Sequence, residues 1–236
     1  MTGTNKKYDF LQGEVLLFDK SKEWTSFDLV QRVRNVLCRN LGIKKMKVGH
    51  AGTLDPLASG LMILCTGKAT KQIESFQEKD KEYSAILKLG ATTPSYDMET
   101  EEEIVPCKLP TKEKIAEILH KFIGESDQVP PLYSAVKIKG VRAFDYARRG
   151  EKPKLNPKKV IIKEINLKSI DLPFITIYVK CGKGTYIRSL ARDIGRELGC
   201  GAYITELRRT KIGNFNVDDA MTIDDFLKNI KTFVTN

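Results

Sequence analysis

One carboxylate in this chain stands in a setting that favours chemistry over packing. Asp55 lies in the glycine-rich stretch Gly49–Gly60, directly before Pro56 and five residues after His50, one of only two histidines. Because Pro56 has a fixed φ and no N–H, we expect Asp55 at a turn or at the cap of a short helix. Such an acid is a candidate nucleophile, and the alternative is that it only caps the turn, as Asp often does.

Three further side chains from distant segments have types that suit a site around an acid. Tyr83 opens the alternating stretch Glu82–Gly90, where an aromatic ring either packs in the core or stacks on a base. Tyr186 and Arg188 begin a helical pattern after a glycine turn. The helix dipole disfavours an arginine in a first turn, so we expect a carboxylate partner for Arg188, and Asp55 is the candidate.

The charge of the chain points to a polyanionic partner. The net charge is +10, and the segment from Lys137 to Lys163 holds ten basic residues against two acidic ones. This pattern favours nucleic acid over a membrane surface. The candidate contacts to an RNA backbone are Lys137, Arg148, Arg149, Lys154 and Lys158. A smaller group, Lys44, Lys45 and Lys47, precedes the Asp55 loop and is either a phosphate contact or a solvated turn.

Several classes of protein are disfavoured by the composition. No apolar run reaches the length of a membrane span, and Met1–Lys7 lacks the apolar core of a signal peptide, so we expect a cytoplasmic protein. The five cysteines are scattered and never form a C-x-x-C pair, which is typical of reduced thiols. Two histidines offer little for a metal site, and we expect no metal and no cofactor.

The elements that must position these residues alternate between strands and helices, which predicts an α+β fold in a single domain over residues 1–236. A capping box at Thr25–Asp28 starts a helix that Gly42 ends, Thr111 caps another, and a third follows Tyr186. The acidic stretch Thr92–Val105 is expected to form a solvent-facing hairpin without chemistry. The expected strands are 14–19, 61–65, 82–90, 133–138, 158–169, 174–182 and 203–212; short helices are expected at 143–149 and 223–230.

Five segments together resemble the bacterial tRNA pseudouridine(55) synthases of the TruB family. They occur in the family's order and span nearly the whole chain: Gly49–Gly60, Lys81–Tyr83, Gln128–Lys137, Gly184–Arg188 and Leu207–Arg209. The first is very specific. The resemblance implies a pseudouridine synthase fold, with a mixed and mostly antiparallel sheet flanked by helices and loops. It also implies a basic segment, around residues 130–163, that clasps the T arm of tRNA, and a monomer.

The resemblance also implies roles for individual residues. Asp55 is the catalytic aspartate, Arg188 its ion-pair partner and Tyr186 the phenol near the base. Tyr83 stacks on the extruded uracil, His50 helps to hold the extruded nucleotide, and Leu207 packs in the pocket, with Lys81 as a further substrate contact. About two dozen residues follow Thr210, so a C-terminal PUA domain is not expected.

The chemistry suits a single carboxylate. Exchanging a C–N for a C–C glycosidic bond needs a nucleophile that holds one fragment while the other rotates. An Asp is already anionic at neutral pH, and the residues leave open whether it attacks uracil C6 or ribose C1′. Two other functions stay open: a noncatalytic tRNA-binding or folding module, and a pseudouridine synthase with another RNA target.

Overall fold

The computed structural model describes residues 7–234, so nearly all of Met1–Lys7, on which the expectation about a leader rests, lies outside the described part. The chain forms two compact units. The first unit comprises the described residues up to Lys81 and those from Arg208 onward, and the second unit comprises Glu82–Leu207. The single domain expected from the sequence stays a prediction.

The sheet of the first unit is built on β3 (Ser59–Thr66), whose side chains are almost all buried. This strand pairs antiparallel with β1 (Val15–Lys20) and β2 (Val48–His50) and parallel with the end of β12 (Ala202–Ile212). A short strand, β13 (Phe215–Asn216), pairs with β12. The parallel pairing brings Arg209 opposite Gly60, so the segment after Asp55 is held between two strands.

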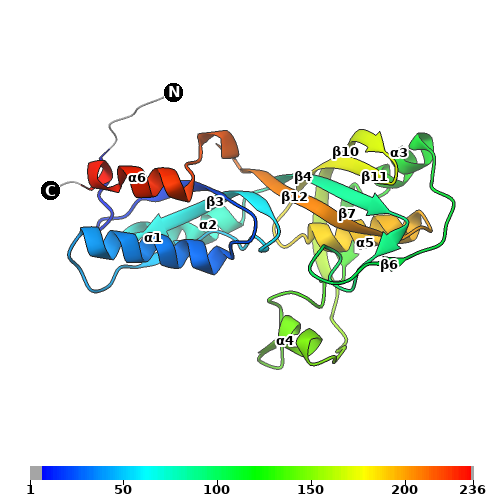
Figure 1. Ribbon diagram of the computed structural model, residues 1–236, viewed down its shortest axis with the longest axis horizontal. Helices are drawn as coiled ribbons and strands as arrows, with labels where there is room; N and C mark the ends of the chain where they lie inside the picture. Colours follow the sequence, from blue (N-terminus) through cyan, green and yellow to red (C-terminus); the bar gives the residue numbers. More distant parts are fainter. Residues whose placement is uncertain (1–6, 235–236) are drawn as a thin grey trace. The chain divides into compact units, whose positions relative to one another are not determined.

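Five helical segments of the described residues complete the first unit. They are α1 (Ser26–Asn40), η1 (Gly67–Gln72), α2 (Ile73–Gln77), η2 (Val217–Asp219) and α6 (Ile223–Phe233). The predicted capping box is confirmed, because Thr25 and Asp28 bond to each other's backbone N–H groups. The predicted end is also confirmed, since Gly42 follows the last turn with φ of +64°. Helices α1 and α6 pack against each other (Figure 1).

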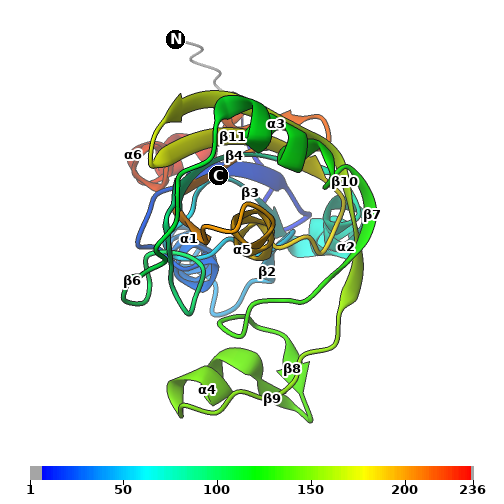
Figure 2. The same cartoon turned by 90° about the vertical axis from the view of Figure 1, so that its right-hand side faces the viewer.

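The second unit is dominated by antiparallel strands. Its strand order is β12, β4 (Lys81–Leu89, whose first residue belongs to the first unit), β11 (Phe174–Cys181), β10 (Lys158–Asp171) and β7 (Gly124–Gln128). These strands curve around α5 (Ile187–Glu197), as Figure 2 shows. Seven of the eleven residues of α5 are buried, including Arg188 and Ser189. A side chain at Gly195 would collide with the backbone of Ala202, so the helix lies close to the start of β12.

The remaining helix of the sheet region is α3 (Lys112–His120), which Thr111 caps as predicted and which packs on β10. The mixed, mostly antiparallel sheet expected from the sequence is confirmed. Within residues 7–234, no helix combines the length and the apolar character that a membrane span needs.

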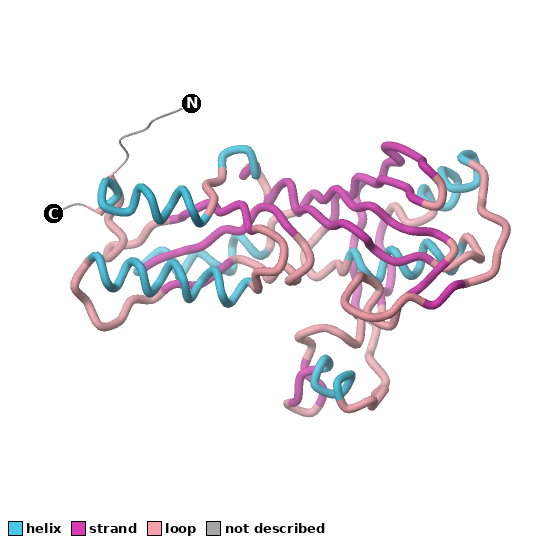
Figure 3. Tube along the Cα trace, viewed as in Figure 1, coloured by secondary structure: helices cyan, strands magenta, loops and turns pink. Residues whose placement is uncertain are grey.

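A small lobe of the second unit carries the first part of the basic segment. It consists of β8 (Lys137–Ile138), β9 (Val141–Arg142) and α4 (Ala143–Arg148), and loops connect it to the strands of this unit (Figure 3). The strand predicted over Tyr133–Ile138 is wrong for residues 133–136. The backbone there turns, and the carbonyl of Tyr133 accepts a hydrogen bond from Arg188 at 2.9 Å instead of joining a ladder.

The prediction for Thr92–Val105 is half correct. The hairpin forms between β5 (Ala91–Thr92) and β6 (Glu103–Ile104). Part of the segment is not solvent-facing, because Thr93, Ser95 and Asp97 are buried, whereas Met98, Glu99 and residues 101–104 are exposed. Burying these polar groups requires hydrogen-bond partners, and Arg188 supplies some of them. The expectation that this segment carries no chemistry stays a prediction, and the structure adds that Asp97 and Ser95 hold the Arg188 side chain.

Candidate active site

Asp55 lies at a turn, as predicted, and its side chain is half-buried. The N–H of Ala58 donates to the carbonyl of Asp55 at 3.1 Å and closes the turn around Pro56. Gly60 follows with φ of +109°, and a Cβ there would collide with the backbone of Arg209. The glycine is needed on both counts, because β12 passes against it and because other residues rarely adopt this φ.

Arg209 binds backbone carbonyls of the Asp55 loop. Its side chain is 2% exposed, and its guanidinium donates to the carbonyls of Leu61 at 2.8 Å, Gly52 at 3.2 Å and Thr53 at 3.4 Å. Among residues 7–234 it has no carboxylate partner. A buried charge is tolerated only when its hydrogen bonds are satisfied, and here backbone carbonyls of the loop satisfy it. The loop and the arginine therefore fix each other.

Ser26 and Lys20 bind the backbone of the residues on either side of Asp55. The hydroxyl of Ser26 donates to the carbonyl of Leu54 at 2.9 Å and accepts from the N–H of Leu54 at 2.8 Å. The ammonium of Lys20 is buried and donates to the carbonyls of Trp24 at 2.7 Å and Pro56 at 3.3 Å. The residues directly before and after Asp55 are thus both hydrogen-bonded to other elements.

The Asp55 charge also reaches Lys20. Burial lowers the pKa of Lys20 to about 8, and the negative charge of Asp55 opposes this shift. A pKa of about 8 still leaves most of the lysine protonated at neutral pH. Lys20 therefore supplies a positive charge beside the loop as well as its hydrogen bonds.

His50 ends β2, five residues before Asp55, with its backbone opposite Leu64 of β3. Burial is the main cause that lowers the pKa of His50, and the charge of Arg209 acts in the same direction. The imidazole is therefore neutral at neutral pH. A neutral ring suits contact with an extruded nucleotide, because it can both donate and accept a hydrogen bond.

Arg188 of the second unit is 4% exposed at the start of α5. It pairs with the carboxylate of Asp97 at 3.4 Å and donates to the carbonyls of Ser95 at 3.1 Å and Tyr133 at 2.9 Å. The expectation of a carboxylate partner for this first-turn arginine is confirmed, and Asp97 is one such partner. The pairing of Arg188 with Asp55 stays a prediction.

Tyr186 is the residue before α5, and Gln128 of β7 fixes its backbone. The Gln128 amide accepts from the N–H of Tyr186 at 2.8 Å and donates to its carbonyl at 3.1 Å. Tyr83 and Leu207 are each 8% exposed, on β4 and β12. Both lie on the buried side of their strands, and their predicted contacts with a base stay predictions.

Lys81 occupies a structural position in the first unit. Its side chain is 7% exposed, and its ammonium donates to the carbonyls of Gln77, at the end of α2, and Lys79. A lysine at the C-terminal end of a helix also interacts favourably with the helix dipole. Its role in substrate binding stays a prediction.

The predicted contacts to an RNA backbone are all exposed, in and around the small lobe: Lys137, Arg148, Arg149, Lys154 and Lys158. The guanidinium of Arg148 lies 5.1 Å from the ring centre of Phe144, and that of Arg149 lies 4.8 Å from the ring centre of Tyr146. Stacking on these rings limits the motion of the arginines and leaves their charge toward solvent.

Three residues of this arrangement were missed by the sequence analysis as site residues. Asp97 was hidden in an acidic stretch, although its isolation between Tyr96 and Met98 sets it apart from the glutamates that follow. Arg209 appeared in a quoted motif without a role, and Lys20 followed a strand without comment. Their burial is a property of the fold, and no local pattern of residues indicates it.

Comparison with known proteins gives concordant results. Residues 39–187 match the TruB family of pseudouridylate synthases (N-terminal domain), and residues 188–235 match the C-terminal domain of tRNA pseudouridylate synthase B. The tRNA pseudouridine synthase B of Phocaeicola vulgatus is 54% identical over 92% of this chain and 93% of its own length. The enzyme of the same name from Flavobacterium johnsoniae is 46% identical over 94% and 98%.

Among solved structures, a chain of a Cbf5–Nop10–Gar1 complex superposes with a TM-score of 0.71 at 30% identity, covering 94% of this chain and 55% of that one. The described residues hold no cluster of three or more His, Cys, Asp or Glu side chains that would suit a metal ion. The matches extend over both units and include every segment on which the resemblance rested. The chain belongs to the TruB family of tRNA pseudouridine synthases, and it has the pseudouridine synthase fold and the isomerase activity of that family.

Proposed function

We propose that this enzyme converts uridine 55 in the T loop of tRNA to pseudouridine, with Asp55 as the nucleophile. The observation that carries the proposal is the fixation of the Asp55 loop: Arg209, Ser26 and Lys20 bond to backbone atoms on both sides of the acid. A loop that only had to turn would not need three buried polar side chains from three other elements. A nucleophile needs such fixation, because catalysis depends on holding the reacting atoms in one geometry.

The reaction is balanced without a redox agent. The N1–C1′ bond breaks, the C5–C1′ bond forms, the proton of C5 leaves and N1 takes up a proton. The Asp55 carboxylate forms a transient bond to one fragment, at uracil C6 or ribose C1′, while the uracil turns. The same bond then breaks, so the carboxylate is regenerated.

The other site residues have separate roles in this proposal. Tyr83 stacks on the extruded uracil, Tyr186 assists removal of the C5 proton, and Arg188 pairs with Asp55. His50 contacts the extruded nucleotide through its neutral imidazole, and Leu207 packs against the base. Lys81 is a further substrate contact in this proposal, and its ammonium also donates to the carbonyls of Gln77 and Lys79.

The free energies of extrusion and stacking are comparable. Extruding a base costs a few kcal/mol, and stacking one base on an aromatic ring returns about 1 to 3 kcal/mol. The exposed cations of the small lobe supply the rest by neutralising phosphates of the T arm. This division assigns recognition to the lobe and chemistry to the Asp55 loop.

The test of the target is a map of pseudouridine at each nucleotide of an unmodified tRNA transcript after incubation with the enzyme. The expected result is modification of uridine 55 alone. A transcript with cytidine at position 55 is the control and should remain unmodified. Modification at another position would contradict the assignment and support a different RNA target.

The role of Arg188 is tested by the variant Arg188→Ala, with Arg196→Ala on the exposed side of the same helix as the matched control. Arg188→Ala should abolish isomerisation and still bind tRNA, because the binding cations lie elsewhere. Arg196→Ala should behave like the wild type, since that side chain is 72% exposed. Activity of Arg188→Ala equal to that of the control would remove Arg188 from the site.

A further inference from the structure

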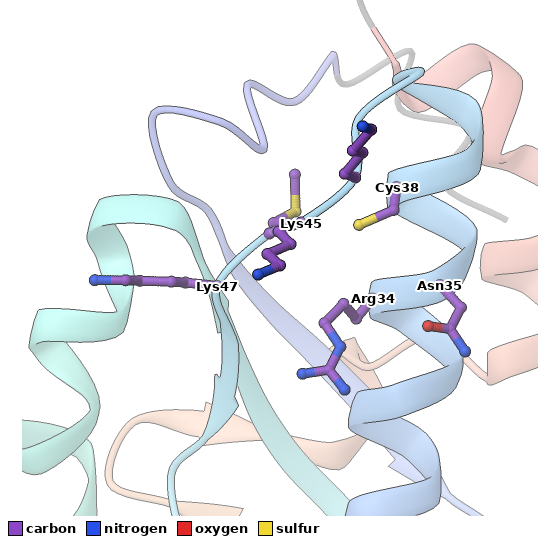
Figure 4. Close-up of a pocket in the computed structure, with 7 residues that line it drawn as sticks. Arg34, Asn35, Cys38, Lys45 and Lys47 are labelled. Carbon is purple, nitrogen blue, oxygen red and sulfur yellow. The ribbon is translucent and has the colours of Figure 1, made fainter.

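A basic groove in the first unit lies outside the residues assigned so far. It has a volume of about 740 Å³ and is formed between α1 and the loop that leads into β2. Four cations line it: Arg34 from the helix and Lys44, Lys45 and Lys47 from the loop. None of the residues that line the groove is acidic. Figure 4 shows Arg34 and Cys38 extending from α1 on the side of the loop, with Lys47 extending on the side away from α1.

Among the described residues, these four cations have no carboxylate partner. Within the described part of the chain, none of them forms an ion pair, whereas Lys88 and Lys114 elsewhere pair with glutamates at 2.6 Å and 3.0 Å. The three lysines are exposed, and Arg34 is half-buried. Like charges held close together repel one another, so a cluster without counterions favours binding of a polyanion.

The chemistry of the groove indicates which part of a nucleic acid it would contact. Its lining contains no aromatic side chain on which a base could stack. The ammonium group of lysine is a compact charge that binds phosphate oxygens well. Such contacts do not distinguish one nucleotide sequence from another. The contact would therefore be to the phosphodiester backbone.

The position of the groove links it to the catalytic loop. The carbonyl of Lys47 accepts from the N–H of Gly67 at 2.9 Å, which fixes the end of the loop on η1. His50 follows three residues later on an extended strand, a distance of about 10 Å. A backbone held at Lys47 would thus place its nearby nucleotides within reach of His50 and the Asp55 loop.

We propose that the groove lined by Arg34, Lys44, Lys45 and Lys47 binds the tRNA backbone close to the target nucleotide. The inference rests on the proposed function and adds a second phosphate contact, in the first unit, to that of the small lobe. Of the two interpretations of Lys44, Lys45 and Lys47, a phosphate contact or a solvated turn, it favours the phosphate contact.

The test compares two double variants with the same change of charge. Lys44→Gln/Lys45→Gln removes two cations of the groove, and Lys228→Gln/Lys231→Gln removes two exposed lysines of α6 in the same unit. At 0.1 M salt the groove variant should bind a tRNA transcript about tenfold more weakly, with the slope of log affinity against log salt reduced by about one to two. Its KM should rise while kcat at saturating tRNA stays unchanged, and the α6 variant should match the wild type.

A second measurement reports the position of the RNA directly. Cys38 lines the groove and is half-buried, whereas Cys107 is exposed in the second unit. In the Cys107→Ser variant, bound tRNA should slow maleimide labelling of Cys38 at least fivefold, as measured by peptide mass spectrometry. Inorganic phosphate at millimolar concentration should not.

Three results would overturn the inference. One is a groove variant that binds tRNA as tightly as the α6 variant does. The second is a rate of Cys38 labelling that tRNA leaves unchanged. The third is protection of Cys38 by inorganic phosphate equal to that by tRNA. Each of these leaves the proposed function intact if the wild type still modifies the transcript. Failure of the wild type to modify tRNA would instead overturn the proposed function, and this inference with it.

Discussion

Two buried arginines, one in each unit, do different work. Arg209 in the first unit donates to three backbone carbonyls around the Asp55 loop and has no carboxylate partner in the described chain. Arg188 in the second unit pairs with the Asp97 carboxylate and donates to the carbonyls of Ser95, in the same segment, and of Tyr133, in another. Arg209 fixes the backbone of the Asp55 loop. The side chain of Arg188 is fixed by the groups around it. The comparison separates a residue that shapes the site from one proposed to act in it.

The largest effect should come from Arg209→Met. The substitution removes the donor of the buried Leu61 carbonyl, at about 1 to 3 kcal/mol, and of the partly buried Gly52 and Thr53 carbonyls, at about 0.5 to 1.5 kcal/mol each. The free energy of unfolding should therefore fall by about 2 to 6 kcal/mol. Urea unfolding measures it. Arg209→Lys is the matched control and should lose less, because an ammonium can still reach one or two of the carbonyls. Equal losses in both variants would show that the geometry of the guanidinium is unimportant.

A smaller effect should follow from Asp97→Asn, which removes the charge that holds Arg188. A hydrogen bond to a charged group contributes about 2 kcal/mol, and the free energy of unfolding should fall by this amount. Asp193→Asn is the control, since this acid pairs with Arg192 on the side of α5 that is more exposed. An equal loss of stability in both variants would show that the buried Arg188–Asp97 pair contributes no more to folding than the more exposed pair.

The sequence predicted most of the elements behind this comparison. The capping box of α1, the alternation of β4 and the cap of α3 are local patterns, and local hydrogen bonds decide them. The strand expected at Tyr133 failed because a residue 55 positions away takes its carbonyl. Propensity cannot include such a partner, since tertiary contacts override it.

The residues of the candidate site also divide into those that local sequence indicates and those that depend on tertiary contacts. Asp55 was identified from its glycine and proline neighbours, which are adjacent in sequence. Asp97, Arg209 and Lys20 were missed, because their importance lies in burial and in partners far along the chain. A charged residue that will be buried looks the same in a sequence as one that will be solvated.

Two exposed lysines of the basic segment, Lys154 and Lys158, extend the comparison to cations at the surface of the second unit. Lys154→Gln/Lys158→Gln should leave the free energy of unfolding within about 0.5 kcal/mol of the wild type. Affinity for tRNA should fall several-fold, with the salt slope reduced by about one for each phosphate that is no longer neutralised. Filter binding at several salt concentrations measures both. A fall in stability would assign these lysines a structural role.

The smallest effect concerns pH and His50. Because the pKa of the buried imidazole is lowered, the unfolded chain takes up a proton near pH 6.5 while the folded chain does not. The free energy of unfolding of the wild type should therefore fall, relative to that of His50→Gln, as the pH drops from about 7 to about 5.5. Above about pH 7 the two should run parallel. A wild type that gains stability on acidification would show that the pKa is raised.

The central claim is that the Asp55 loop holds a nucleophile, and Asp55→Asn tests it most directly. The variant keeps the size of the side chain and removes its charge, so the fixed loop should persist. The measurement is pseudouridine formation in a tRNA transcript under single-turnover conditions, together with the affinity for that transcript. The account predicts wild-type affinity and no pseudouridine at uridine 55. Pseudouridine formation by Asp55→Asn at a rate near that of the wild type would contradict it.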